Sequence, residues 1–225
     1  MTSLLLATDD LLRGRLAPEG DAARAARLLP RLLLTLVAFG VLYGATMGTF
    51  GGVHGQRALQ PLYSGLKVPM LLLVTFAVSL PSFFVLNTIL GVREDFREVF
   101  RALIATQAGL TVVLAALAPF TAFWYVSFAG YEAALMFNAA MFAVASFAGQ
   151  WMLRRFYRPL VARNPRHRVL LRGWLIIYAF VGIQMGWVLR PFVGVPGRPV
   201  TFFREGAWVN AYEEVARTAL RALGL

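Results

Sequence analysis

The chain has 225 residues, of which 59% are hydrophobic and only 15% are charged, and its net charge is +11. An ordinary soluble domain is excluded, because it would need more polar surface to cover its core. The lack of cysteine excludes disulfides, thiolate metal sites and cysteine nucleophiles, and two histidines give no basis for a histidine-rich metal site.

The first 30 residues precede the apolar part of the chain, and we predict that they form a cytoplasmic amphipathic segment. Their apolar patch, residues 4–7, is followed at once by Asp9 and Asp10, which is not the pattern of a cleaved signal peptide. Leucines between residues 4 and 16 share one face of a predicted helix, which favours a helix along the membrane surface. A simply packed N-terminal helix is the alternative.

Five apolar runs follow, and they predict an all-α, polytopic membrane domain over residues 31–190. Each run is near or above the roughly 20 residues that an α-helix needs to cross about 30 Å of hydrocarbon. Residues 127–130 join the third run to the fourth in a short turn, which predicts an antiparallel hairpin. The predicted spans are Leu32–Gly52, Val68–Gly91, Phe100–Val126, Tyr131–Leu153 and Val169–Arg190.

The basic residues alternate between the predicted loops and indicate the orientation. Arginines gather before the first span, between the second and third, and above all between the fourth and fifth. The positive-inside rule therefore predicts a cytoplasmic N-terminus and a C-terminus on the outer side. Lys67, assigned to the first outer loop, is the single lysine, and this arginine bias is typical of a GC-rich bacterial genome. We expect a bacterial inner membrane.

Residues 191–225 are predicted to form an outer-side segment. The prolines and glycines of residues 191–199 prevent a helix there. From about Glu205 to Leu223, apolar residues recur at helical spacing, but the interspersed charges make this segment too polar to span the bilayer. An amphipathic helix on the outer surface is expected.

Glycines spaced four residues apart mark two of the spans. Small residues let helix backbones approach closely in lipid, so we interpret these glycines as packing positions. The contact is made within the chain or, alternatively, between copies in a homo-oligomer. These glycines are Gly40, Gly44 and Gly48 in the first span and Gly182 and Gly186 in the fifth.

Five neutral amides fall within the spans at two depths. An amide in hydrocarbon needs a partner, so interhelical hydrogen bonds are expected, and a polar substrate path is the alternative. No charged residue falls in the middle of a predicted span, which argues against an ion-coupled transporter. The inner tier is Asn87, Gln107 and Gln150, and the outer tier is Asn138 and Gln184.

Pro81 and Pro119 lie inside the second and third spans and are interpreted as helix kinks, with a broken, transporter-type helix as the alternative for Pro81. Arg190 ends the fifth span and is interpreted as an interface anchor whose guanidinium reaches lipid phosphate. The alternative is an ion pair that docks the tail helix, formed with Glu205, Glu213 or Glu214.

No catalytic residue, cofactor site or metal site is predicted. His54 has no acidic or serine partner at a recognisable spacing, and no phosphate-binding glycine loop occurs. The basic residues fall mainly between the spans, which indicates membrane topology rather than nucleic-acid binding. The expected partners are the bilayer, a second copy or other membrane subunits, and anionic lipid at Arg154, Arg155 and Arg158.

Two short runs and the order of the spans suggest a family. Lys67-Val68-Pro69-Met70 opens the second span, and Leu80-Pro81-Ser82 lies within it. In this layout the chain resembles bacterial Yip1-like membrane proteins over about residues 30–190. The resemblance implies a five-helix membrane domain without known enzymatic residues, whose eukaryotic relatives act in membrane trafficking through partners.

These features favour a non-enzymatic membrane scaffold or complex subunit that interacts through glycine-lined helix faces. The alternative is a passive channel or transporter for a small polar solute, based on the two amide tiers and Pro81. A third hypothesis is a lipid-modifying enzyme that gathers anionic headgroups at its arginine-rich inner loop.

Overall fold

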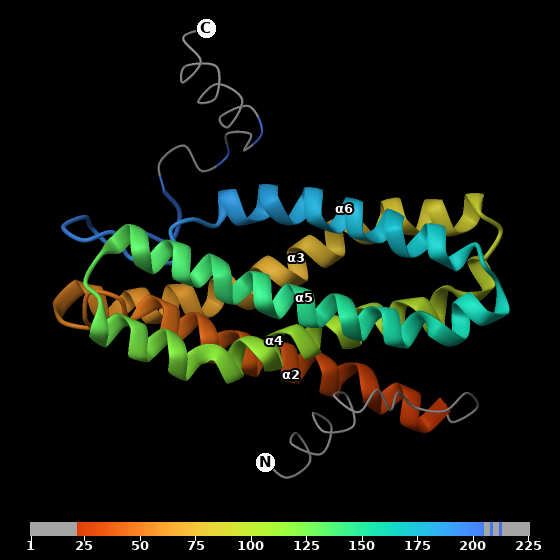
Figure 1. The fold of residues 1–225 in the computed structure, drawn as a ribbon, viewed down its shortest axis with the longest axis horizontal. Coiled ribbons are helices and arrows are strands. Elements are labelled where there is room, and N and C mark those ends of the chain that lie inside the picture. Colours follow the sequence, from red (N-terminus) through yellow and green to blue (C-terminus); the bar gives the residue numbers. More distant parts are fainter. Residues whose placement is uncertain (1–21, 205–207, 209–211, 213–225) are drawn as a thin grey trace, which may run out of the picture.

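The computed structural model describes residues 22–204, 208 and 212, and their regular structure is entirely helical (Figure 1). Five of the helices are long and apolar enough to cross a membrane, which confirms the predicted fold class. The amphipathic helices predicted near the two termini fall almost wholly outside the described residues. The elements are α2 (Ala22–Gly48), η1 (Gly55–Ala58), α3 (Leu59–Ile89), η2 (Arg93–Asp95), α4 (Phe96–Ser127), α5 (Tyr131–Arg163) and α6 (His167–Val188).

Four helices are longer than their predicted spans, and α3 and α5 are lengthened the most. Helix α3 begins at Leu59 because Pro61 falls in its first turn, where a missing N–H costs little. Lys67 is therefore not a loop residue: it lies inside α3 and is fully buried. Helix α5 runs on to Arg163 and ends before Pro165, which disfavours the helical conformation in the residue preceding it.

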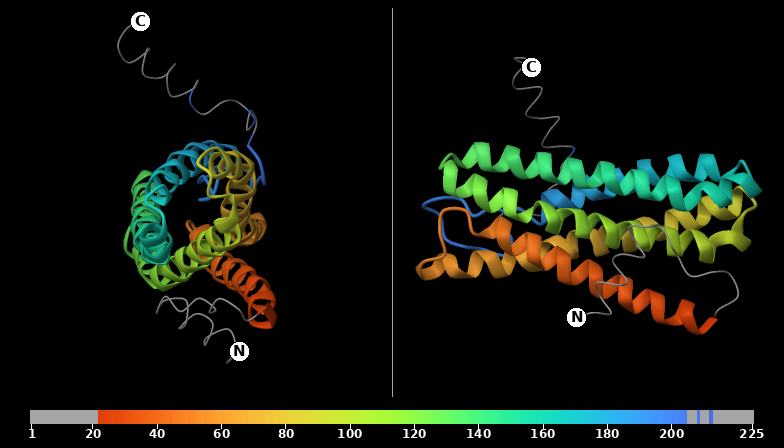
Figure 2. Two further views of the ribbon diagram at one scale, coloured as in Figure 1. Left: turned by 90° about the vertical axis from the view of Figure 1, so that its right-hand side faces the viewer. Right: turned by 60° about the horizontal axis from the view of Figure 1, so that its bottom comes forward.

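The helices form two pairs joined by a fifth helix. Helix α3 packs on α6, and α4 packs on α5 as the predicted hairpin, whereas α3 and α4 make few contacts and α5 and α6 also make few. Helix α2 packs on both α3 and α4 and so bridges the pairs. The end-on view in Figure 2 shows α3, α4, α5 and α6 arranged as a ring, with α2 against one side.

The glycines of α2 are where it approaches α3 most closely. A Cβ on Gly44 would overlap the backbone of Ser64, and one on Gly48 would lie 2.6 Å from the Cα of Pro61. Gly40 faces Pro69 at 3.3 Å. These three glycines thus serve packing within the chain, the first of the two interpretations given for them.

The two ends of the bundle carry different connecting segments and different buried clusters. We call the end that carries residues 49–58, 128–130 and 189–204 the Arg190 end, and the opposite end the His167 end. A buried apolar cluster at the His167 end includes Phe83, Tyr157 and Trp174. A second cluster at the Arg190 end includes Tyr43 and Val193, so the segment after α6 contributes to the core.

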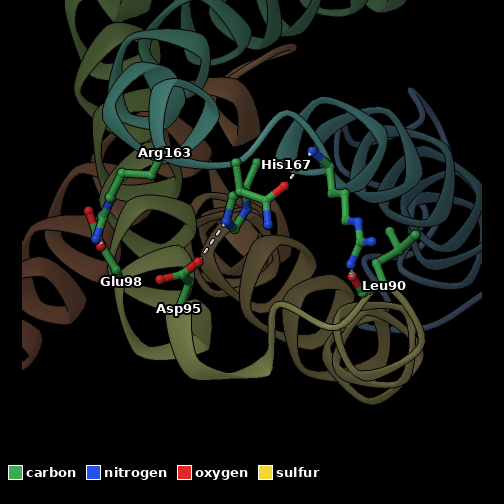
Figure 3. A network of polar contacts seen from close by, with 7 residues as sticks. Leu90, Asp95, Glu98, Arg163 and His167 are labelled. Carbon is green, nitrogen blue, oxygen red and sulfur yellow. Dashed lines mark hydrogen bonds and ion pairs between the residues drawn. The ribbon is translucent and has the colours of Figure 1, made fainter.

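A polar network ties the connection between α5 and α6 to the connection between α3 and α4 (Figure 3). The buried His167 ring places Nε2 2.9 Å from Oδ2 of Asp95. Arg166 donates to the carbonyl oxygen of Leu90 at 3.0 Å, and Arg163 pairs with Glu98. Because these contacts join α6 and α5 to the residues around η2, the helix pairs are fixed to each other at this end.

Helix α3 ends in a glycine turn that shapes this network. Gly91 adopts a left-handed conformation with a φ of 69°. Its N–H donates to the carbonyl of Thr88, and the N–H of Val92 donates to that of Asn87. This is the Schellman pattern of a helix terminus, and it leaves the carbonyl of Leu90 available to Arg166.

Replacing Gly44 with alanine is expected to destabilise the fold, because the added methyl group meets backbone atoms that cannot move aside. Overpacking of this kind costs roughly 1–3 kcal/mol. The matched control is Gly186→Ala, since a Cβ at Gly186 would meet no atom within 4 Å. Thermal unfolding in one detergent, followed by circular dichroism, should show a lower Tm for the first variant only. Equal Tm values would contradict the close contact between α2 and α3.

Asp95→Ala is expected to destabilise the His167 end more than Glu98→Ala. The first change leaves a fully buried histidine without a partner, which costs roughly 1–3 kcal/mol. The second breaks an ion pair whose side chains are 47% and 32% exposed, and such pairs contribute about 0–1 kcal/mol. Chemical or thermal unfolding of both variants checks the order, and the reverse order would refute it.

Candidate functional site

A cleft of about 430 Å³ lies between the α3–α6 pair and the α4–α5 pair. It is partly open, and it is bordered by α5 and α6, which pack little on each other. Most of its surface is apolar. The lining residues are Leu71, Leu72, Thr75, Thr106, Gln107, Leu110, Phe142, Ser146, Gly149, Gln150, Leu153, Trp174, Leu175, Tyr178, Ala179, Gly182 and Ile183.

Small residues on the two loosely packed helices leave this space unfilled. Ser146 and Gly149 face the cleft from α5, and Ala179 and Gly182 face it from α6. Each pair is three residues apart and so lies on one helix face. A Cβ on Gly182 would make only an ordinary contact, 3.5 Å from Cγ2 of Thr75, so this glycine leaves space and is not required for a close approach of α6 to α3.

A few polar groups stand within the apolar lining. The hydroxyl of Tyr178 donates to Oε1 of Gln107 at 2.8 Å and joins α6 to α4. The hydroxyl of Thr75 and Oε1 of Gln150 are buried and have no hydrogen-bond partner. Buried polar atoms are normally paired, so these two mark places where a bound molecule or water would gain a hydrogen bond.

Of the five predicted amides, the structure brings only Gln107 and Gln150 to this cleft. Asn138 instead binds Tyr43 and Tyr125 and thereby links α5 to α2 and α4. Asn87 donates to the carbonyl of Phe83 in its own helix. Gln184 lies on α6 outside the cleft lining. The inner and outer tiers therefore do not form one continuous polar path.

The face of α6 that lines the cleft continues toward the Arg190 end. Trp174, Tyr178 and Gly182 line the cleft at intervals of four residues, and Gly186 follows at the same interval. Ile183 lines it too, and Trp187 lies one turn beyond Ile183. The space around Gly186 is open, because a Cβ built there would have no atom of the described residues within 4 Å.

Two arginines stack on this tryptophan. The guanidinium carbon of Arg190 lies 3.5 Å from the centre of the Trp187 ring, and that of Arg204 lies 4.4 Å from it. Burial, together with the neighbouring Arg204, lowers the pKa of Arg190, while Tyr131 opposes the shift. No carboxylate among the described residues pairs with either guanidinium. The predicted partners of Arg190 in the tail, Glu205, Glu213 and Glu214, lie outside the described residues.

Three N–H donors of this arginine–tryptophan cluster are buried without an acceptor. They are Nε of Arg190, Nε of Arg204 and Nε1 of Trp187. An unpaired buried donor is costly, and a charged one more so. The cluster thus combines two positive charges with unused hydrogen-bonding capacity.

The segment after α6 is held on the N-terminal part of α3 by its backbone carbonyls. Nζ of Lys67 donates to the carbonyl oxygen of Pro191 at 2.6 Å and lies 5.0 Å from the centre of the Phe202 ring. Gln60 donates to the carbonyl of Phe192 at 3.1 Å, and Ser64 donates to the same oxygen. These contacts satisfy carbonyl groups that no helix satisfies.

Arg57 extends this attachment. Its guanidinium donates to the carbonyl oxygen of Phe50 at 2.8 Å and to those of Gly194 and Val195 at 3.4 and 3.3 Å. The side chain joins the α2–α3 loop to the segment after α6. Lys67 and Arg57 are thus paired with carbonyls of the chain, in contrast to the two arginines on Trp187.

The remaining predicted positions lie away from the cleft. Pro81 and Pro119 stand inside α3 and α4, which continue through them as helices. The candidate lipid-binding arginines are exposed on α5 rather than in a loop, because the helix extends past them; they are Arg154, Arg155 and Arg158.

Sequence reasoning missed the attachment by Lys67 and the polar role of Tyr178. Lys67 was placed in the first outer loop because the predicted second span begins at Val68. The fact that Lys67 is the single lysine of the chain was the available signal that it has a particular role. The spacing of Trp174, Tyr178 and Gly182 could have indicated a common face of the helix.

Comparisons of the chain with protein families, with curated proteins and with solved structures find no match. Within the described part of the chain, no group of three histidine or acidic residues is placed to hold a metal ion. The candidate site is therefore the cleft with its arginine–tryptophan cluster.

Lys67→Met is expected to loosen residues 189–204 from α3. A hydrogen bond to a charged donor contributes roughly 1.5–3 kcal/mol, so its loss should raise the detached population about tenfold or more. Chymotrypsin cleavage at Phe192, Phe202 or Phe203 should speed up accordingly. The control is Arg198→Gln, which removes an exposed charge from the same segment. Equal cleavage rates in both variants would contradict the attachment.

Proposed function

We propose that the chain is a non-enzymatic membrane protein that holds the hydrocarbon chain of a lipid in the cleft between α3, α4, α5 and α6. It would act as a lipid-binding subunit of a membrane assembly. The observation that carries the proposal is the cleft itself: an apolar, partly open space between two helices of a membrane bundle that pack little on each other.

The size and lining of the cleft fit this occupant. Its volume of about 430 Å³ falls in the range of about 300–1,000 Å³ that is usual for small-molecule sites. The polar groups in the lining are amides and hydroxyls, which hydrogen-bond but suit proton transfer poorly. Among the described residues, no carboxylate, imidazole or amine lines the cleft, and this supports binding over catalysis.

A passive channel is supported less well by the same geometry. A channel needs a continuous polar path, whereas Asn138 is bound between Tyr43 and Tyr125, away from the cleft. The hydrogen bond from Tyr178 to Gln107 also crosses between the helices where a path would run. Lipid binding needs no continuous polar path, so it is consistent with both features.

The orientation of the chain and the membrane in which it lies are also part of the proposal. Most arginines of the described residues lie near the His167 end, so the positive-inside rule supports a cytoplasmic location for that end. The composition supports a bacterial inner membrane. A Yip1-like role through protein partners is compatible with lipid binding, and contacts between copies would involve faces other than the three glycines of α2, which pack on α3.

The test uses the intact protein in bilayers that contain a phospholipid with a diazirine in the middle of one acyl chain. After irradiation, we expect adducts on Thr106, Gln107 and Leu110 of α4. These residues are at most 7% exposed, so bulk lipid reaches them only through the cleft. Adducts on Phe123 and Val126, which are 72% and 89% exposed, report ordinary lipid contact.

A variant that narrows the cleft completes the test. Ser146→Phe places a large ring on the lining face of α5, and it should remove the adducts on the three buried positions while leaving the exposed ones. The matched control is Ala140→Phe, an exposed position of α5 outside the lining. Absence of adducts at the buried positions in the unmodified protein would refute the proposed function.

A further inference from the structure

The arginine–tryptophan cluster of Trp187, Arg190 and Arg204 lacks a partner within the described chain. Both guanidinium carbons lie within 4.4 Å of the centre of one indole ring, and the charge of Arg204 disfavours the charge of Arg190. Each guanidinium keeps a buried Nε without an acceptor, and so does the indole Nε1. An anion between the groups would remove the repulsion and accept these hydrogen bonds.

The position of the cluster relates it to the cleft. The cleft-lining face of α6 passes from Gly182 and Ile183 to Gly186 and Trp187 within one turn, a rise of about 6 Å. Gly186 leaves open space between the lining residues and the cluster. Since α6 ends at Val188, Arg190 lies just beyond the spanning helix, at the depth where lipid headgroups begin.

Guanidinium groups suit the phosphate that every glycerophospholipid carries. Their planar array of N–H donors matches two phosphate oxygens at once, and charge-assisted bonds of this kind are stronger than neutral ones. By contrast, the single ammonium group at this end, on Lys67, is already used by the carbonyl of Pro191.

We propose that Arg190 and Arg204 bind the phosphate of an anionic glycerophospholipid whose acyl chain lies in the cleft. This inference rests on the proposed function and adds a specific headgroup site to it. The headgroup lies at Trp187, and the chain follows the face of α6 past Gly186 and Gly182 toward Gln107 and Gln150. The lipid then comes from the leaflet at the Arg190 end.

The site differs from general contact between an interface arginine and lipid. A single exposed arginine exchanges its lipids freely and leaves none bound after purification. Two stacked guanidinium groups and an adjoining cleft hold one molecule by both of its parts. The expected stoichiometry is therefore one retained phospholipid per chain.

Native mass spectrometry of the full chain tests the proposal. The protein is exchanged into detergent with equal amounts of phosphatidylglycerol, phosphatidylcholine and diacylglycerol that carry the same acyl chains. We expect one retained phosphatidylglycerol, less phosphatidylcholine, and little diacylglycerol. The double substitution Arg190→Gln and Arg204→Gln should lower phosphatidylglycerol retention at least about tenfold. Arg198→Gln, an exposed charge in the same segment, should leave it unchanged.

Equal retention of phosphatidylglycerol and diacylglycerol, or unchanged retention in the double variant, would overturn the headgroup site. Gln replacement of the tail glutamates Glu205, Glu213 and Glu214 should not change retention. An increase in retention would show that these carboxylates pair with the arginines, and it would also overturn the proposal. Photoadducts of a diazirine phosphatidylglycerol on Thr106 and Gln107 of the unmodified protein in bilayers separate the two proposals. If the adducts persist while headgroup selectivity is absent, only the headgroup site fails, and without them the cleft function fails too.

Discussion

The close contact between α2 and α3 is the constraint on which the rest of the arrangement depends. Burial of apolar surface gives helices little reason to associate in lipid, so intimate backbone packing carries more of the stability. At Gly44 and Gly48, α2 approaches α3 too closely for any side chain. Because α2 also packs on α4, it joins the two helix pairs while α3 and α4 hardly meet. The cleft between the pairs follows from this bridging.

A second constraint explains the Arg190 end. Non-helical backbone near a membrane must find hydrogen bonds, and the carbonyls of residues 191, 192, 194 and 195 find them in Lys67, Ser64, Gln60 and Arg57. The positive charge of Lys67 is thereby used within the protein. Arg190 and Arg204 instead stack on the Trp187 ring, and their Nε atoms, like that of Arg57, are buried without an acceptor among the described residues.

Sequence alone was sufficient for the membrane class, the number of spans and the α4–α5 hairpin, because these depend on run length and on a four-residue turn. It failed at the start of α3, because the span was predicted from Val68, whereas the helix begins at Leu59 and includes Pro61 and Pro69. The amides were identified, but their partners were not, because the bonds of Asn138 to Tyr43 and of Gln107 to Tyr178 depend on which helices are neighbours. The cleft could not be predicted from the sequence either, because it depends on how far apart α5 and α6 lie.

The central claim is that the two helix pairs stand apart around a bound lipid chain. The most direct measurement is an electron cryomicroscopy structure of the protein in a lipid nanodisc. The account predicts elongated density between α5 and α6 that reaches Gln107 and Gln150, with the pairs joined through α2. A structure in which α5 packs on α6 along its length, with the cleft closed and no density within it, would contradict the account.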